Sequence, residues 1–279
     1  MFRVFLSIIF SLFSVVYSVN AQTQEETVRL GDKMFAQENF EQAAKLFKRV
    51  AFFGDDSAQA YVYPKIAKSE LMNKNYRESL FFYDISLNTA TCDSTYNEFI
   101  FKIALCHLLL NEPQKALIKV YSYQDSNAYF QHKYNFYMGV IHLKIGQYEK
   151  AKKYFLSAAH GHDYYDDISE RLNTIDFNKP YPTLAKILSI FIPGLGQLYA
   201  GDAFNAANSF LLNGGLAASF FYIAERHSFI NAITSIGPWF QRYYTGGFNR
   251  AEKIALMKQK EKRDKFLVYI LTVMKNDWK

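Results

Sequence analysis

The sequence predicts an all-α fold in which a helical-repeat solenoid is followed by a transmembrane helical hairpin. Three observations support this fold: similar segments recur every 35 to 37 residues, a later stretch of 22 residues has no charged side chain, and a glycine-rich sequence precedes that stretch. Half of the 279 residues are hydrophobic, which is enough for a large core. The formal net charge of +6 is modest for this length and does not indicate a nucleic-acid partner.

The first residues have the pattern of a signal peptide. Arg3 supplies a short basic start, residues 4–19 form an apolar run, and Val19-Asn20-Ala21 places small or aliphatic side chains before a cleavage point. We expect residues 1–21 to be the signal peptide, with an uncleaved membrane anchor as the alternative. No cysteine follows the run, so a lipoprotein anchor is not indicated.

Residues 22–176 contain four segments with the same order of small and large residues. A small residue stands near the start of each segment: Gly31, Ala67, Ala104 and Gly139. A second small residue follows in the later half: Ala43, Ser79, Ala116 and Ala151. A large residue comes four positions later: Phe47, Tyr83, Val120 and Phe155. An aromatic residue or proline is expected to open the second helix: Phe40, Tyr76, Pro113 and Tyr148. Small residues let two helices approach closely, and the large residue fills the space between them.

This pattern resembles the tetratricopeptide repeat (TPR), whose unit is two antiparallel helices in about 34 residues. The signature tryptophan is absent, and the slightly longer units imply longer loops between repeats. The resemblance implies four stacked repeats whose first helices line a concave face that binds a protein partner. The residues expected on that face are Asp32, Phe35, Lys68, Leu71, Phe101, Leu105, Phe136 and Val140. The alternative is that most of these side chains fill the interior of a short array.

The segment from His160 to Asp167 leads from the last repeat to a predicted capping helix. Its two histidines and three aspartates are metal-ligand types. However, His160 and His162 are two positions apart and would point to different sides of a helix. We therefore expect one helix to end at Gly161, and we predict no metal and no cofactor. Cys92 and Cys106 are expected to remain unbonded, because about ten helical residues hold them roughly 15 Å apart.

The composition changes after residues 177–182, which contain two prolines and read as a linker. Between Ile187 and Ala224 the only acidic or basic residue is Asp202. Residues 203–224 are long enough to cross a bilayer as a helix. A charged break at residues 225–227 separates them from a second, less apolar run. We expect residues 183–249 to form a membrane module built on a helical hairpin, with a soluble apolar domain as the alternative.

The sequence Ile-Pro-Gly-Leu-Gly-Gln-Leu-Tyr-Ala-Gly, residues 192–201, stands before the hairpin. It resembles the Pro-Gly-x-Gly-Gln-x-Tyr-x-Gly motif of TM2-like and related bacterial membrane modules of unknown function. The matching residues are Pro193, Gly194, Gly196, Gln197, Tyr199 and Gly201. The likeness covers about residues 181–255, implies membrane residence and supplies no catalytic mechanism. If Gln197 is buried, its amide needs a partner, and the candidates are Asn205, Asn208 and Asn213.

Residues 250–279 form a basic tail with nine Lys or Arg and four Asp or Glu, a net charge of +5. One interpretation is an amphipathic segment on an anionic membrane. The alternative is a solvated helix that packs the apolar residues 266–274 against the rest of the protein.

The sequence contains none of the common catalytic motifs, such as GxSxG, HExxH or a phosphate-binding loop with Lys-Ser/Thr. We therefore expect no catalytic residues and no enzyme. The predicted function is a membrane-anchored scaffold of the bacterial envelope, with the repeats in the periplasm and the hairpin in the membrane. Two alternatives stay open. One is a membrane enzyme or transport accessory that uses Gln197, Asn205 and Arg242. The other is a soluble periplasmic adaptor.

Overall fold

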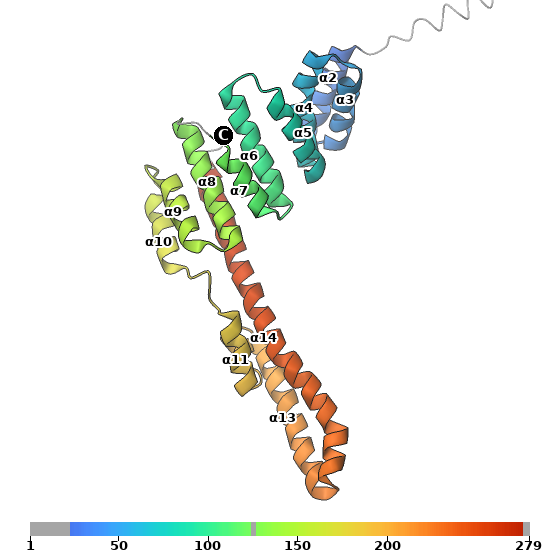
Figure 1. Cartoon of the computed structure of the whole chain (residues 1–279), viewed down its shortest axis with the longest axis vertical. Helices are drawn as coiled ribbons and strands as arrows, with labels where there is room; N and C mark the ends of the chain where they lie inside the picture. Colours follow the sequence, from blue (N-terminus) through green and yellow to red (C-terminus); the bar gives the residue numbers. More distant parts are fainter. Residues whose placement is uncertain (1–22, 124–126, 276–279) are drawn as a thin grey trace, which may run out of the picture. The chain divides into compact units, whose positions relative to one another are not determined.

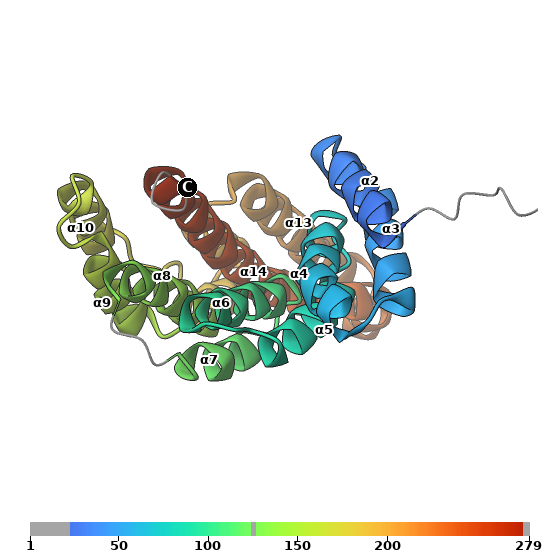
Figure 2. The same cartoon turned by 90° about the horizontal axis from the view of Figure 1, so that it is seen from above.

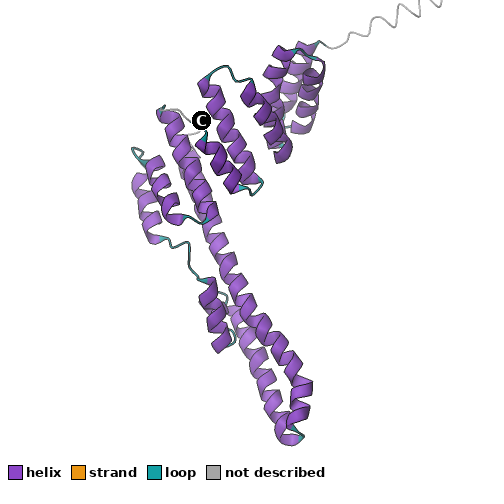
Figure 3. Ribbon diagram, in the orientation of Figure 1, coloured by secondary structure: helices purple, strands orange, loops and turns teal. Residues whose placement is uncertain are grey.

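The computed structural model describes residues 23–123 and 127–275, and within these ranges it contains helices and no strand (Figure 3). This confirms the all-α class. The predicted signal peptide lies outside the described residues. The chain divides into two compact units, Met1–Ile145 and Gly146–Lys279, which are described one at a time.

The first unit is a succession of helices in which each helix packs against the next (Figures 1 and 2). In chain order they are α2 (Gln24–Ala36), α3 (Phe40–Phe53), α4 (Asp56–Met72), α5 (Tyr76–Asn88), α6 (Asp93–Leu109), α7 (Pro113–Tyr121) and α8 (Ala128–Ile145). The second helices begin at the predicted residues Phe40, Tyr76 and Pro113. The repeat pattern therefore located these helix starts correctly.

The repeat pattern also identified core residues correctly. All twelve small and large positions of the pattern are buried. Gly31 shows why a small residue is needed, because a Cβ atom there would lie 2.6 Å from the ring of Phe47. One core cluster joins Phe47 and Val50 of α3 to Val62 and Ile66 of α4. Consecutive helix pairs thus share one core, as stacked repeats require.

The turn inside each helix pair contains a left-handed residue that the sequence analysis did not identify. In the first unit these residues are Glu38, Lys74 and Asn111, with φ values of 61°, 65° and 59°. In the second repeat the Lys74 N–H donates to the Leu71 carbonyl (3.1 Å), and the Asn75 N–H donates to the Glu70 carbonyl (2.8 Å). This pair of bonds is the Schellman motif, which satisfies carbonyls at a helix end.

The second unit contains six helices in its described residues. They are α9 (Tyr148–Ala159), α10 (Tyr165–Thr174), α11 (Pro182–Phe191), α12 (Leu195–Tyr199), α13 (Ala203–Arg226) and α14 (Phe229–Val273). Helix α10 lies where the capping helix was predicted. The predicted hairpin is also present: α13 and α14 lie side by side (Figure 1) and are joined at residues 227–228.

Helix α14 is continuous over 45 residues and runs through the boundary predicted after residue 249. Residues 250–265 are mostly good helix formers and contain no glycine or proline, so nothing interrupts the helix there. Its last turns pack within this unit: the Phe266 ring lies 5.6 Å from Phe155 and 5.2 Å from Phe177, between ring centroids. The Tyr269 hydroxyl donates to Asp167 (2.6 Å). This packing agrees with the alternative interpretation of the tail, in which a solvated helix packs its apolar residues against the rest of the protein.

The predicted transmembrane character of the hairpin is not supported. Within residues 23–123 and 127–275, no helix has both the length and the apolar composition that a membrane crossing requires. Helix α13 lacks charged residues before Glu225, but the amides of Asn205, Asn208 and Asn213 reduce its apolar character.

Candidate functional site

The glycines of the motif at residues 192–201 let three helices meet closely. Gly194 precedes α12 with a φ of 96°, and a Cβ atom there would lie 2.4 Å from the Ala206 carbonyl oxygen. A Cβ atom at Gly196 would lie 1.7 Å from the Ala185 carbonyl oxygen. No side chain fits at these distances. The two glycines therefore allow α12 to contact both α11 and α13.

Gln197 is fully buried at this junction, and its amide is bonded on both sides. The Ser189 hydroxyl donates to Gln197 Oε1 (2.8 Å), and Gln197 Nε2 donates to the Gly247 carbonyl (2.9 Å). The Gly196 N–H in turn donates to Ser189 Oγ (3.0 Å). The expected asparagine partners were therefore wrong. Gln197 instead links α11 to α14, and the sequence offered no local signal for either partner.

The remaining motif residues shape the ends of the junction. The Tyr199 hydroxyl accepts the backbone N–H of Tyr181 (3.1 Å), just before α11. Gly201 has a φ of 81° and forms the same type of turn as the repeats, with its N–H donating to the Leu198 carbonyl (2.9 Å). Pro193 lies in the turn between α11 and α12. These contacts give the motif a packing role that joins α11, α12, α13 and α14.

The residues expected on the concave face have different environments. Phe101 and Phe136 are buried, so for them the alternative of interior packing is correct. Asp32 and Lys68 are exposed, and the other four are half-buried: Phe35, Leu71, Leu105 and Val140.

The structure brings part of this set together on α2 and α4. Asp32 pairs with Lys65 (2.6 Å), a residue that the sequence analysis did not select. The Lys68 ammonium lies 5.0 Å from the centroid of the Phe35 ring. These first helices of two repeats therefore form a charged and aromatic surface, defined here by Asp32, Phe35, Lys65 and Lys68 and called the α2/α4 surface.

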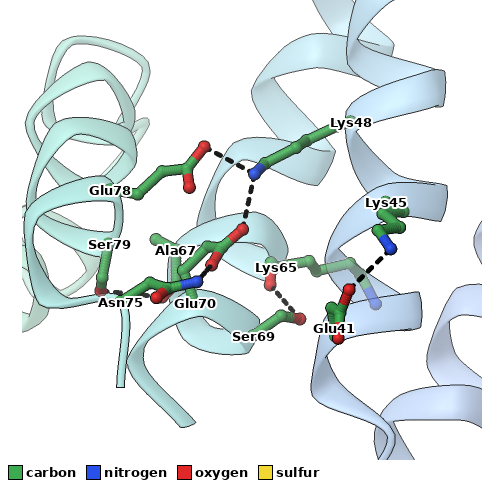
Figure 4. A network of polar contacts seen from close by, with 10 residues as sticks. All are labelled: Glu41, Lys45, Lys48, Lys65, Ala67, Ser69, Glu70, Asn75, Glu78 and Ser79. Atoms are coloured by element: carbon green, nitrogen blue, oxygen red, sulfur yellow. Dashed lines mark hydrogen bonds and ion pairs between the residues drawn. The ribbon is translucent and has the colours of Figure 1, made fainter. Parts of the chain in front are cut away.

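A buried carboxylate network in the first unit was also missed (Figure 4). Glu70 is 3% exposed, and its carboxylate lies 2.5 Å from Lys48 Nζ and accepts from Asn75 Nδ2 (2.7 Å). Lys48 also pairs with Glu78 (2.6 Å). Burial opposes the charge of Lys48, but the hydrogen bonds to Glu70 and Glu78 outweigh it and raise the Lys48 pKa. The network joins α3, α4 and α5 and is structural.

The cysteines and histidines form no centre among the described residues. No disulfide joins Cys92, which is exposed, to Cys106, which is buried. Burial raises the pKa of the Cys106 thiol. No group of three or more His, Cys, Asp or Glu side chains in the described ranges is arranged to hold a metal ion.

The residues of the membrane-enzyme alternative do come together. Gln197, Asn205 and Arg242 line one cavity of about 320 Å³ beside the junction.

The fold defines an all-α protein with a helical-repeat unit and a helical hairpin. No protein-family model matches the chain, and no curated protein sequence matches it. The likenesses to TPR proteins and to TM2-like modules therefore depend on the residues quoted above.

Proposed function

We propose that the chain is an exported TPR-like scaffold of the bacterial envelope, whose repeat helices bind a protein partner. The observation that carries the proposal is the α2/α4 surface. It lies on the first helices of two consecutive repeats, which is the face that TPR-like arrays are expected to offer to partners. Lys68 has no ion-pair partner among the described residues, although its ammonium lies over Phe35. A free cation beside an aromatic ring suits an acidic or carboxylate-bearing peptide segment.

Site-directed photo-crosslinking in the native cells tests this interaction. A crosslinking amino acid replaces Lys68. In a matched variant it replaces Lys115, an exposed lysine on α7, which is the second helix of its repeat. Position 68 is expected to give a discrete crosslinked product, and position 115 is expected to give none. The same products from both positions, or none from position 68, would contradict the scaffold proposal.

We further propose that the hairpin attaches the scaffold to a membrane surface. Helices α11, α13 and the first half of α14 expose large apolar side chains, which soluble monomers seldom gather in one region. Those more than two-thirds exposed are Phe191, Phe204, Leu211, Phe221 and Ile230. Flotation of the purified full-length protein with liposomes tests the attachment. A protein that stays in the dense fraction would instead be the soluble adaptor.

A further inference from the structure

The cavity beside the motif junction has the features of a ligand site. It is bounded by α12, α13 and α14, and its volume is about 320 Å³. Gly246 and Gly247 lie in its wall, and a Cβ atom at Gly247 would approach the Ser209 hydroxyl to 3.1 Å. The absence of side chains at these two positions of α14 helps to keep the space between the hairpin helices open.

The cavity wall carries two arginines without an ion pair. Arg242 and Arg250 both line the cavity, and neither pairs with a carboxylate among the described residues. The Asp202 carboxylate accepts from the backbone N–H (3.0 Å) and the side-chain amide (2.6 Å) of Asn205 and forms no ion pair with Arg250, although the charge of Arg250 adds to these hydrogen bonds in lowering the Asp202 pKa. The guanidinium groups therefore remain available for an anion, and their fork of donors suits phosphate oxygens.

Two buried polar atoms in the same wall lack a hydrogen-bond partner. Asn213 is only 3% exposed; its Nδ2 donates to the Ser209 carbonyl (2.8 Å), while its Oδ1 is unpaired. The Ser209 hydroxyl is also unpaired. Buried polar atoms are rarely left unsatisfied, because such an atom loses its hydrogen bonds to water without gaining others. A ligand that supplied both an acceptor for Ser209 and a donor for Asn213 would replace these lost hydrogen bonds.

We propose that this cavity binds a phosphate ester that also carries a hydroxyl group. The phosphate meets Arg242, Arg250 and the Ser209 hydroxyl, and the ligand hydroxyl donates to Asn213 Oδ1. The same chemistry occurs in a soluble phosphate ester and in the headgroup of a phospholipid such as phosphatidylglycerol. This inference does not depend on the protein partner of the repeat unit.

Trp239 provides a reporter, because its ring stacks on the cavity residue Tyr243 with centroids 6.3 Å apart. The test uses full-length protein carrying Trp278→Phe, so that Trp239 is the single tryptophan. The probes are glycerol 3-phosphate, inorganic phosphate, and vesicles of phosphatidylcholine with or without phosphatidylglycerol. We expect a saturable fluorescence change with glycerol 3-phosphate or with phosphatidylglycerol vesicles. The first result identifies a soluble ester, and the second a lipid headgroup.

The double variant Arg242→Gln/Arg250→Gln is expected to lower, at least tenfold, the affinity for the probe that binds the unmodified protein. The control Arg226→Gln/Lys253→Gln removes the same charge from exposed positions outside the cavity and is expected to keep the affinity. Asn213→Leu separates binding from folding, because it should weaken glycerol 3-phosphate or phosphatidylglycerol binding while leaving thermal stability unchanged or higher. Equal losses in both double variants, equal binding of inorganic phosphate and the ester, or no saturable change with any probe would overturn the proposal.

Discussion

At the residue scale, Glu70 shows how the repeat array accommodates a buried charge. Its carboxylate is almost fully buried and is held by Lys48 from α3 and by Asn75 from the start of α5. An ionised carboxylate without such partners would lose its hydration with little in return. Lys48 therefore supplies the positive charge that compensates for the buried carboxylate of Glu70.

Lys48→Met is expected to lower the free energy of unfolding by about 2 kcal/mol. The loss is smaller than the ~3–5 kcal/mol of fully buried pairs, because 33% of the Lys48 side chain is exposed. The matched control is Lys45→Met on the same helix, because its pair with Glu41 (Figure 4) is exposed and should contribute much less to stability. Urea unfolding at pH 7 measures both values. Equal losses would show that burial of Glu70 does not matter.

Lys74 illustrates a second residue-scale effect, because a side chain in the left-handed region is strained. Lys74→Gly is expected to raise the free energy of unfolding by about 0.5–1 kcal/mol. Lys74→Ala keeps a Cβ atom at the same φ of 65° and is the control, with an expected change near zero. Thermal unfolding by circular dichroism distinguishes the two variants. A glycine variant less stable than the alanine variant would refute the strain argument.

At the element scale, the short helix α12 determines how α11 and the hairpin meet. Gly194, Gly196 and Gln197 place it against neighbours from both directions in the chain, with Ser189 eight residues earlier and Gly247 fifty residues later. The core cluster around it contains four alanines, Ala185, Ala200, Ala251 and Ala255, together with Ile254. Small side chains allow short distances between helix backbones, so the junction tolerates little added volume.

Gly196→Ala is expected to destabilise the second unit by about 3 kcal/mol or more, because the new methyl group would overlap the Ala185 carbonyl. Gly214→Ala in α13 is the control: a Cβ atom there meets no other atom within 4 Å. That change should be neutral or stabilise by up to about 1 kcal/mol. Hydrogen exchange of the α11–α12 backbone amides reports the loss locally. Similar exchange in both variants would disprove the close contact.

At the scale of the whole molecule, each compact unit contains groups that hold their protons more tightly in the folded state. In the first unit, hydrogen bonds outweigh burial and raise the Lys48 pKa, and burial raises the Tyr83 pKa. In the second unit, burial and the hydrogen bond to Asp167 raise the Tyr269 pKa. A raised folded-state pKa stabilises the fold below the unfolded value, and that contribution disappears as pH rises.

The protein is therefore expected to lose stability in alkaline solution. The unfolded-state values are near 10.0 for tyrosine and 10.5 for lysine, so the loss should begin at about pH 10 and grow above it. Urea unfolding at intervals between about pH 8 and pH 12 measures it. Lys48→Met should show a smaller decrease over the same interval, since one of the contributing groups is gone. A free energy of unfolding that stays constant or rises above pH 10 would contradict this expectation.

The sequence by itself determined the helical class, the buried positions of the repeats, the starts of their second helices and the hairpin. These features follow from local spacing: Gly31 must be small because Phe47, sixteen residues later, packs on it. Pro113 and the aromatics at equivalent positions likewise recur at the repeat period.

The tertiary structure alone decided the partners of Gln197, the pairing of Glu70 with Lys48 and the cavity beside Arg242 and Arg250. Each of these depends on which helix faces meet, and the contacting residues are as many as fifty positions apart. These contacts between helix faces result from the packing of many side chains together, so no single spacing in the sequence predicts them. The expected asparagine partners of Gln197 failed for this reason, because Gly247 offered a backbone carbonyl that residue types do not reveal.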